Sequence, residues 1–316
     1  MDEGQNNLVM CRELGRDYGG QTAVSSLSFS LARGEVLGFL GPNGAGKSTT
    51  MNMLSGCLAP SRGEVEICGI DLLASPAQAK AHIGYMPEHP PLYPELTVDE
   101  YLRFAARLRG LPRRRVKAAV ETARERCGLA DVGHRPIGQL SRGYQQRVGI
   151  AQAIVHEPAL VILDEPTVGL DPNQVREIRA LIQTLARDHG VILSTHILPE
   201  VAAVCSRVQI MVRGQLVFES PMAELGDAGE GGGRLKLHLS EQAEADPLAG
   251  LSGVSRVETL GPGQFRLHHA GNKELAPAVA QLAVDRGWSL YRLEPETRDL
   301  EQIFVSLTSG EEADAA

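Results

Sequence analysis

The sequence of 316 residues is short of cysteine and has no excess of positive charge. Its five cysteines are odd in number, and no two have the spacing of a metal site or a CxxC pair, so neither a disulfide framework nor a zinc site is expected. Lysine and arginine total 31 against 39 aspartates and glutamates, a formal net charge of -8. This acidity argues against a protein that binds nucleic acid over a broad surface.

Long hydrophobic runs are also missing. No apolar run approaches the roughly 20 residues that span a bilayer. The polar start MDEGQNN lacks the apolar segment of a signal peptide. A protein of this kind that acts at a membrane is expected to do so through a partner.

Apolar residues nevertheless make up 43% of the chain, enough for one full domain and a smaller one. Residues 1–225 alternate short apolar runs with helical patterns, which is typical of an α/β fold. Residues 88–140 are rich in proline and then in arginine, and we expect them to form a helical insertion. The apolar runs predict buried strands at 35–40, 160–163, 191–194 and 208–212.

A glycine-dense linker, residues 226–233, is predicted to precede an accessory C-terminal α+β domain, residues 234–316, whose last residues we expect to be disordered. Its pattern predicts the order strand–helix–strand–strand–helix–strand and a terminal helix, which suggests a ferredoxin-like fold. The expected segments are 235–239, 241–251, 254–260, 264–268, 273–286, 288–293 and 299–307. No chemical motif occurs there, so dimerisation, regulation of turnover and partner binding all stay open as its function.

The strongest chemical motif is GPNGAGKST at residues 41–49, here called the phosphate-binding loop. It matches GxxxxGK[ST] and stands between an apolar strand and a helical segment, as the motif requires. The glycines let backbone N–H groups turn toward a polyphosphate. Lys47 supplies a positive charge to the outer phosphates, and Ser48 offers a hydroxyl to Mg²⁺.

Acidic and histidine side chains follow two other predicted strands. Asp164 and Glu165 end the run LVIL, where a parallel sheet opens its ligand crevice. Asp164 is placed to assist Mg²⁺, and Glu165 is a candidate general base for an attacking water. His196 ends the run VILSTH beside Ser194 and Thr195, which makes it a candidate γ-phosphate sensor.

Six motifs now stand in one order, namely Tyr18, GPNGAGKST, LSRGYQQR, LVILDEP, GLD and STH. From about Val9 to Ser220 the chain resembles the ATP-binding subunit of an ABC transporter, whose domain is an α/β P-loop NTPase. The resemblance implies that Tyr18 stacks on adenine and that Asp171 lies in the loop after the base. It implies that ATP and Mg²⁺ are held by Gly41, Pro42, Asn43, Gly44, Ala45, Gly46, Lys47, Ser48 and Thr49, with Glu88 and Asp164 on the metal.

The resemblance also assigns a function to LSRGY, residues 140–144, here called the signature turn. In this family two ATP-binding domains pair head to tail, and each ATP is sandwiched between one phosphate-binding loop and the partner's signature turn. Ser141, Arg142, Gly143 and Tyr144 would therefore act in trans, on the partner's ATP. A helix N-terminus with free N–H groups suits a phosphate physically as well.

Three features depart from the common family pattern. The signature usually reads LSGGQ, and whether Arg142 faces phosphate or solvent stays open. Glu88 replaces the usual glutamine, which keeps an oxygen for Mg²⁺ but adds a negative charge beside ATP. The glycine linker and the C-terminal domain are additions. Together with the ending DLEQIFVSLT, these features resemble bacterial exporters with a separate membrane subunit, including drug-resistance, sodium-efflux and gliding-motility systems.

We therefore expect an ATPase that energises an exporter by ATP-driven dimerisation, peripheral on the cytoplasmic side of the inner membrane. Its partners would be a second copy and a transmembrane permease, with no nucleic acid. The alternative is a soluble ABC-type ATPase acting on ribosomes or DNA, which usually carries a second nucleotide domain or a long coiled coil; neither is visible. The basic stretch RLRGLPRRRVK, residues 107–117, fits either a solvated surface or contact with anionic lipid or an acidic partner.

Overall fold

The computed structural model describes residues 7–226, 233–240, 242–269, 275–295 and 300–309. Contacts between Cα atoms divide the chain into two compact units, Met1–Glu219 with Leu307–Ala316, and Ser220–Ser306. In the described part of the chain, no helix combines the length and the apolar character needed to cross a bilayer.

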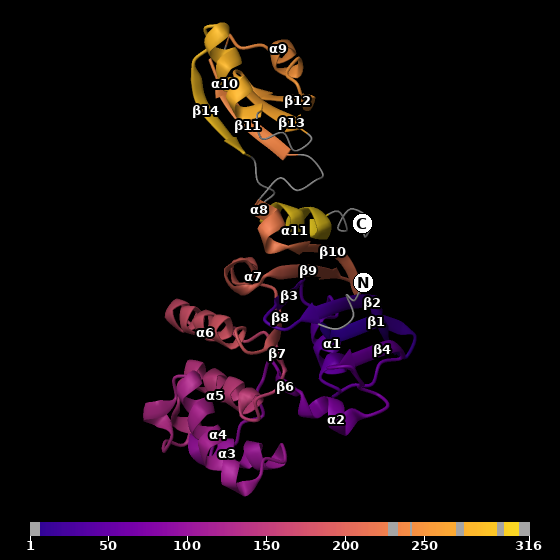
Figure 1. Cartoon of the computed structure of the whole chain (residues 1–316), viewed down its shortest axis with the longest axis vertical. Helices are drawn as coiled ribbons and strands as arrows, with labels where there is room; N and C mark the ends of the chain where they lie inside the picture. Colours follow the sequence, from indigo (N-terminus) through magenta and orange to yellow (C-terminus); the bar gives the residue numbers. More distant parts are fainter. Residues whose placement is uncertain (1–6, 227–232, 241, 270–274, 296–299, 310–316) are drawn as a thin grey trace. The chain divides into compact units, whose positions relative to one another are not determined.

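The first unit is built on a six-stranded sheet with the order β10-β9-β3-β8-β7-β6 (Figure 1). The four strands expected from the sequence are present, and the five strands β6, β7, β8, β3 and β9 run parallel to one another. All residues of β3, β7 and β8 are buried, which explains their continuously apolar sequences. The strands are β3 (Val36–Leu40), β6 (Ile83–Met86), β7 (Leu160–Asp164), β8 (Gly190–Thr195), β9 (Arg207–Val212) and β10 (Gln215–Pro221).

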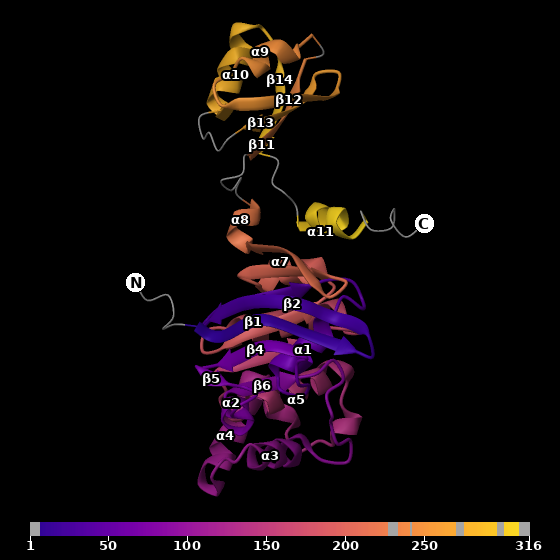
Figure 2. The same cartoon turned by 90° about the vertical axis from the view of Figure 1, so that its right-hand side faces the viewer.

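A second, antiparallel sheet with the order β2-β1-β4-β5 was not among the predicted strands. Figure 2 faces this sheet. The pairing of β1 with β2 shifts register four times, so β1 does not keep the simple alternation of buried and exposed residues that reveals a strand in a sequence, and β2 keeps it only from Leu27 to Ala32. The strands are β1 (Asn7–Tyr18), β2 (Gln21–Ala32), β4 (Arg62–Ile67) and β5 (Ile70–Asp71).

Helices separate and flank these sheets. The helix α1 (Lys47–Leu54) contacts β2 of the antiparallel sheet and β7 and β8 of the parallel sheet. On the other side of the parallel sheet lie α6 (Pro172–Leu185) and α7 (Leu198–Val204) (Figure 1). The core between the sheets includes Leu14, Leu27, Phe39, Met51 and Ile162.

The stretch expected to form a helical insertion contains α3 (Val98–Leu108) and α4 (Arg113–Arg126). A capping box starts α3, because Thr97 accepts the N–H of Glu100 while the Glu100 carboxylate accepts the N–H of Thr97. Both helices pack against α5 (Arg142–Ile154). The remaining short helices of this unit are α2 (Pro76–Ala81), η1 (Ala130–Val132) and η2 (Ile137–Gln139).

The second unit follows the predicted element order around a four-stranded sheet, β12-β13-β11-β14. Leu248 of α9 and Val279 of α10 pack with Leu237 and Phe265 of the sheet in one core. Of the predicted linker 226–233, residues 227–232 lie outside the described residues, while Gly226 ends α8 and Gly233 begins β11. The predicted disordered last residues, 310–316, also lie outside the described residues. The elements are α8 (Met222–Gly226), β11 (Gly233–Leu239), α9 (Ala245–Ala249), β12 (Val254–Gly261), β13 (Gln264–His269), α10 (Leu275–Asp285), β14 (Leu290–Pro295) and α11 (Leu300–Ser309).

Candidate functional site

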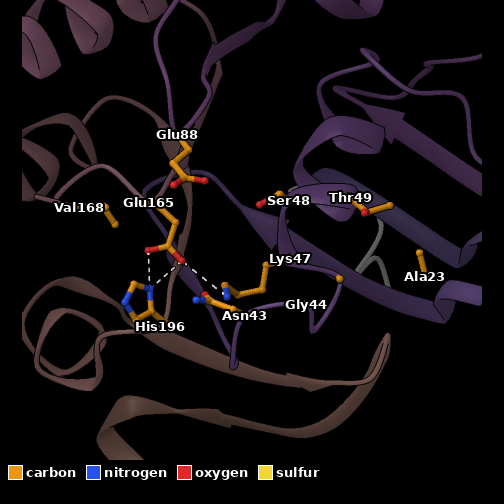
Figure 3. Close-up of a pocket in the computed structure, with 11 residues that line it drawn as sticks. Ala23, Asn43, Gly44, Lys47, Ser48, Thr49, Glu88, Glu165, Val168 and His196 are labelled. Carbon is orange, nitrogen blue, oxygen red and sulfur yellow. Dashed lines mark hydrogen bonds and ion pairs between the residues drawn. The ribbon is translucent and has the colours of Figure 1, made fainter.

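A cavity of 460 Å³ opens where β3, β7 and β8 end and α1 begins. The parallel register brings the ends of these strands to one edge, so residues more than a hundred positions apart in sequence meet there. Figure 3 shows the side chains of Lys47, Glu165 and His196 pointing toward one another. The lining residues are Ala23, Asn43, Gly44, Gly46, Lys47, Ser48, Thr49, Glu88, Glu165, Val168 and His196.

The phosphate-binding loop needs glycine at two positions for different reasons. Gly46 has φ of 99° at the N-cap of α1, a conformation that side chains with a Cβ rarely adopt. Gly41 lies so close to β9 that an added Cβ would stand 2.4 Å from the carbonyl oxygen of Met211. The loop therefore presents its backbone and the N-terminus of α1 to the cavity, which is the arrangement that binds phosphate.

Lys47 is 5% exposed, yet its ammonium group is fully engaged. Its Nζ donates to the carbonyl oxygens of Gly41, at 2.8 Å, and Pro42, at 3.2 Å. It also lies 3.6 Å from Oε1 of Glu165. A buried ammonium group is stable only when hydrogen bonds and an opposite charge replace its lost hydration. These three contacts therefore hold the positive charge of Lys47 beside the cavity.

Ser48 and Asp164 face each other as expected for a pair of metal ligands. The Ser48 hydroxyl donates to Oδ1 of Asp164 at 3.4 Å, and the Ser194 hydroxyl donates to the same oxygen. Burial raises the pKa of Asp164, and the two hydroxyl hydrogen bonds partly offset that rise. The two hydroxyl groups thus hold the Asp164 carboxylate beside Ser48, which lines the cavity, although Asp164 itself does not line it.

This oxygen donor set fits Mg²⁺ bound together with a phosphate. Among the described residues, no group of three or more histidine, cysteine, aspartate or glutamate side chains is placed to hold a metal ion by itself. Mg²⁺ usually keeps several waters and takes one or two protein ligands plus substrate phosphates. Ser48 and Glu88 line the cavity, and the Asp164 carboxylate lies 3.4 Å from the Ser48 hydroxyl, so these three oxygen donors meet that requirement.

Glu165 is 6% exposed and sits on a tight turn after β7, with φ of 48° and its N–H bonded to the carbonyl of Ser194. Its two carboxylate oxygens lie 3.1 and 3.0 Å from Nδ1 of His196. Because a carboxylate only accepts, Nδ1 carries the hydrogen in this contact. Figure 3 shows the Glu165 carboxylate between His196 and Lys47.

The structure adds a buried acid that the sequence did not indicate. Glu200 of α7 is 2% exposed. One of its oxygens accepts from the hydroxyl of Thr167, and the other accepts from the hydroxyl of Thr195 at 2.7 Å. Thr195 in turn accepts the N–H of Ile197 at 3.0 Å. Glu200 therefore joins the loop after Glu165 to the strand end that carries His196.

Glu88 lines this cavity and also a second cavity of 520 Å³ between the segment after β6 and α5. The second cavity includes Arg142 and Gln146. Gln146 is 4% exposed. Glu88 is thus the residue that both cavities share.

The signature turn forms the N-terminus of α5, with Ser141 as the N-cap in an extended conformation and without a capping hydrogen bond from its side chain. Gly143 is buried, whereas Tyr144 is 39% exposed beneath the Arg147 guanidinium at 5.5 Å. Arg142 is exposed and lies against Gly169. None of the four residues lines the first cavity.

Gly41, Pro42, Ala45 and Asp164, also predicted site residues, lie close to lining residues in the chain without lining the cavity themselves. Tyr18 and Asp171 also stand apart from the lining. Tyr18 is 47% exposed, with the Arg16 guanidinium 4.7 Å from its ring centre. Asp171 is the N-cap of α6 and accepts the N–H groups of Asn173 and Gln174. Their assigned roles, contact with adenine and a place at a dimer interface, stay predictions.

The basic stretch at residues 107–117 is largely solvent-facing. Arg113, Arg114 and Arg115 are exposed at the start of α4. Arg115 lies 3.6 Å from Glu157, and Arg109 donates to the carbonyl of Lys80. The two readings of this stretch both stay open.

Comparison with known proteins agrees with this geometry. The family model described as "ABC transporter" matches residues 24–168. The chain is 35% identical to the uncharacterized ABC transporter ATP-binding protein YhcH of Bacillus subtilis, over 95% of this chain and 96% of that protein. It is 33% identical to the bacitracin transport ATP-binding protein BcrA of Bacillus licheniformis, over 96% and 98% respectively.

Solved structures of ABC transporter subunits are similar to about 70% of this chain. The structure of cbiO1 from Clostridium perfringens, part of the ABC transporter complex cbiONQ, superposes with a TM-score of 0.64 at 31% identity. The match covers 70% of this chain and 90% of that one. An ATP-binding subunit of an ABC transporter superposes with a TM-score of 0.62 at 32% identity, over 69% and 91%. The chain belongs to the ATP-binding, ATP-hydrolysing subunits of ABC transporters.

Proposed function

We propose that this chain powers an exporter of drug-like or antibiotic compounds by binding Mg²⁺–ATP, closing a head-to-tail homodimer and hydrolysing ATP at Glu165. The relatives motivate the export direction. They include a bacitracin transport protein and, at 31% identity over 95% of this chain, a linearmycin resistance ATP-binding protein of Bacillus subtilis. The membrane partner would be a separate permease, with this subunit peripheral on the cytoplasmic side.

The observation that carries the proposal is the grouping of Lys47, Ser48, Glu165 and His196 around one cavity. Phosphates would lie on the backbone N–H groups of residues 41–49, with Lys47 as the counter-charge. Ser48 and Asp164 would hold Mg²⁺, which neutralises developing negative charge on the phosphates when bound. Glu88, which also lines the cavity, would reach the metal or its water.

Glu165 would accept the proton of the attacking water, because it is a buried carboxylate that lines the cavity 3.6 Å from Lys47. In the structure that carboxylate is engaged by both Lys47 and His196. A phosphate would compete for Lys47, and a freed carboxylate oxygen could then accept from water. His196 would keep the carboxylate oriented through Nδ1.

The dimer would supply what one chain lacks. The Ser141 hydroxyl makes no capping hydrogen bond at the N-terminus of α5 and lies outside the first cavity. This hydroxyl and the free N–H groups of the first turn of α5 can therefore bind the ATP of a second copy. A two-fold axis then gives two equal sites.

The test is reconstitution. The chain, co-expressed with the membrane protein that co-purifies with it, should yield a membrane complex whose ATP hydrolysis rises with a transported peptide antibiotic. The Glu165→Gln complex, with equal subunit content, is the control that measures substrate movement without ATP hydrolysis. A complex that moves substrate equally well with Glu165→Gln would contradict the proposal.

A further inference from the structure

The Arg142 side chain of the signature turn lies across the backbone of Gly169. A Cβ added to Gly169 would stand 2.6 Å from both Cζ and one terminal nitrogen of Arg142, and 3.1 Å from its Nε. Three atoms of one guanidinium at these distances mean that its plane covers the glycine. Gly169 has φ of 73°, so both its conformation and its contact require the absence of a side chain.

The neighbouring residue of the signature turn makes a second contact with the same region. A Cβ added to Gly143 would stand 2.7 Å from Cδ and 2.9 Å from Oε1 of Gln174. Gln174 lies in the first turn of α6, where its N–H is held by Asp171 at 3.0 Å. The first turn of α5 therefore rests on the loop 166–170 and on the helix that follows it.

The same loop forms part of the ATP cavity. Val168, the residue before Gly169, lines the cavity beside Glu165. Thr167, one residue earlier, is bonded to the buried Glu200. The loop thus has one end fixed beside the hydrolysis site and the other beneath the guanidinium of Arg142.

The guanidinium keeps its N–H groups available. No residue in the described part of the chain accepts a hydrogen bond from the Arg142 side chain or forms an ion pair with it. Arg142 is the first helical residue of α5, directly after Ser141. A planar guanidinium at a helix N-terminus suits a phosphate oxygen, so an ATP brought to the signature turn has a charged group to attract.

We propose that Arg142 couples the two ATP sites of the dimer, by packing on the loop 166–170 of its own site and responding to the ATP bound by the partner. This inference rests on the proposed head-to-tail dimer. The phosphates of an ATP at the signature turn attract the Arg142 guanidinium. Movement of the guanidinium repositions the loop 166–170 beneath it, and with it Val168 beside Glu165. The proposed coupling is favourable, and coupling between binding sites is reciprocal, so each ATP raises the affinity of the other site by the same factor.

The first test is ATP-driven dimerisation in a Glu165→Gln parent, which isolates binding from turnover. Arg142→Ala in that parent should raise the ATP concentration at half-dimerisation about tenfold, within the usual range of coupling between sites. Binding of a fluorescent ATP analogue to the dilute monomer should stay as in the parent. Arg176→Ala, an exposed arginine on α6, serves as the matched control and should leave both values unchanged.

Amide hydrogen exchange measures the protection of the loop 166–170 directly. In the parent, residues 166–170 should gain protection when ATP drives dimerisation, and Arg142→Ala should remove most of that gain. Arg142→Lys should behave like the alanine variant, because a lysine keeps the charge but not the plane that covers Gly169. Full rescue by lysine would mean that charge alone matters and would overturn the coupling.

Gly169→Ala should reproduce the Arg142→Ala result, because its Cβ displaces the guanidinium. Gly110→Ala is the control for backbone strain: its φ is 76°, and a Cβ there meets nothing within 4 Å. The double variant Arg142→Ala/Gly169→Ala should be no worse than either single variant, the mark of one shared interaction.

The outcomes separate the two proposals. A parent that stays monomeric with Mg²⁺–ATP contradicts the proposed function and with it the coupling. A parent that dimerises while Arg142→Ala matches it, in both half-point and loop protection, contradicts the coupling alone.

Discussion

Oε1 of Glu165 lies 3.6 Å from Nζ of Lys47, and both side chains are almost wholly buried. The residue proposed to activate water and the residue proposed to hold phosphate are therefore each other's counter-charge. A phosphate that attracts Lys47 removes the positive charge nearest the carboxylate. Binding of ATP and exposure of the base are thus linked in a single ion pair.

Glu165→Gln should slow ATP hydrolysis by at least about a hundredfold, because general base catalysis contributes factors of that order. ATP binding should persist, since Lys47 and the loop 41–49 are untouched. Phosphate release and nucleotide binding are measured on the same preparation. Glu121→Gln, an exposed change on α4, is the control. Turnover within a fewfold of the parent would remove Glu165 from the role of base.

Glu200→Ala should lower both stability and turnover. It leaves the hydroxyls of Thr167 and Thr195 without their buried acceptor, a loss of about 1–3 kcal/mol per unsatisfied group. Thermal or urea unfolding gives the stability change. Turnover measured well below the melting temperature, alongside Glu200→Gln, separates positioning of His196 from simple unfolding. An Ala variant as stable as the parent would show that the network contributes nothing.

Ser141→Arg should leave ATP binding by the isolated chain nearly intact and abolish ATP-driven dimerisation and hydrolysis. The reason is that Ser141 lies at the start of α5 and not in the wall of its own cavity. Titration of a fluorescent nucleotide and light scattering report the two properties. A collapse of monomer affinity would contradict an action in trans.

Stability should fall between pH 7.5 and pH 5 because of His156. Burial lowers the pKa of His156 from 6.5 to about 4, and Arg109 and His189 reinforce this. Well above pH 6.5 the His156 ring is neutral in both the folded and the unfolded protein, so it takes nothing from the free energy of unfolding. Below pH 6.5 the unfolded chain takes up the proton first, so folding loses about 2 kcal/mol by pH 5.

The control for this pH dependence is His156→Gln, which can still donate to the carbonyl of Ile83, the partner of Nε2 at 3.0 Å. Urea unfolding of both proteins at several pH values isolates the contribution of one ring. Parallel curves for the two proteins, with no divergence between pH 6.5 and 5, would contradict the account.

The parts of the site that follow from local signals were predictable. The loop 41–49, the strands 160–163 and 191–194, and the side chains that end them need only neighbouring residues to be recognised, and the structure brings Lys47, Glu165 and His196 together. That these side chains meet then follows from the rule that parallel strands open at one edge of the sheet.

Other features depend on contacts between distant residues. Glu200 and Thr167 are 33 positions apart, and no local pattern relates a glutamate in a short helix to a threonine after a strand. The contact of Arg142 with Gly169 is likewise visible only in the fold. The strand β1 escaped detection because its bulges break the alternation on which recognition depends.

The most direct test of the account is the mass of the Glu165→Gln chain in solution, by analytical ultracentrifugation. With Mg²⁺–ATP it should sediment as a dimer that retains two ATP molecules, and with Mg²⁺–ADP as a monomer. A monomer under both conditions, with ATP demonstrably bound, would contradict the claim that each ATP site is completed by a second copy.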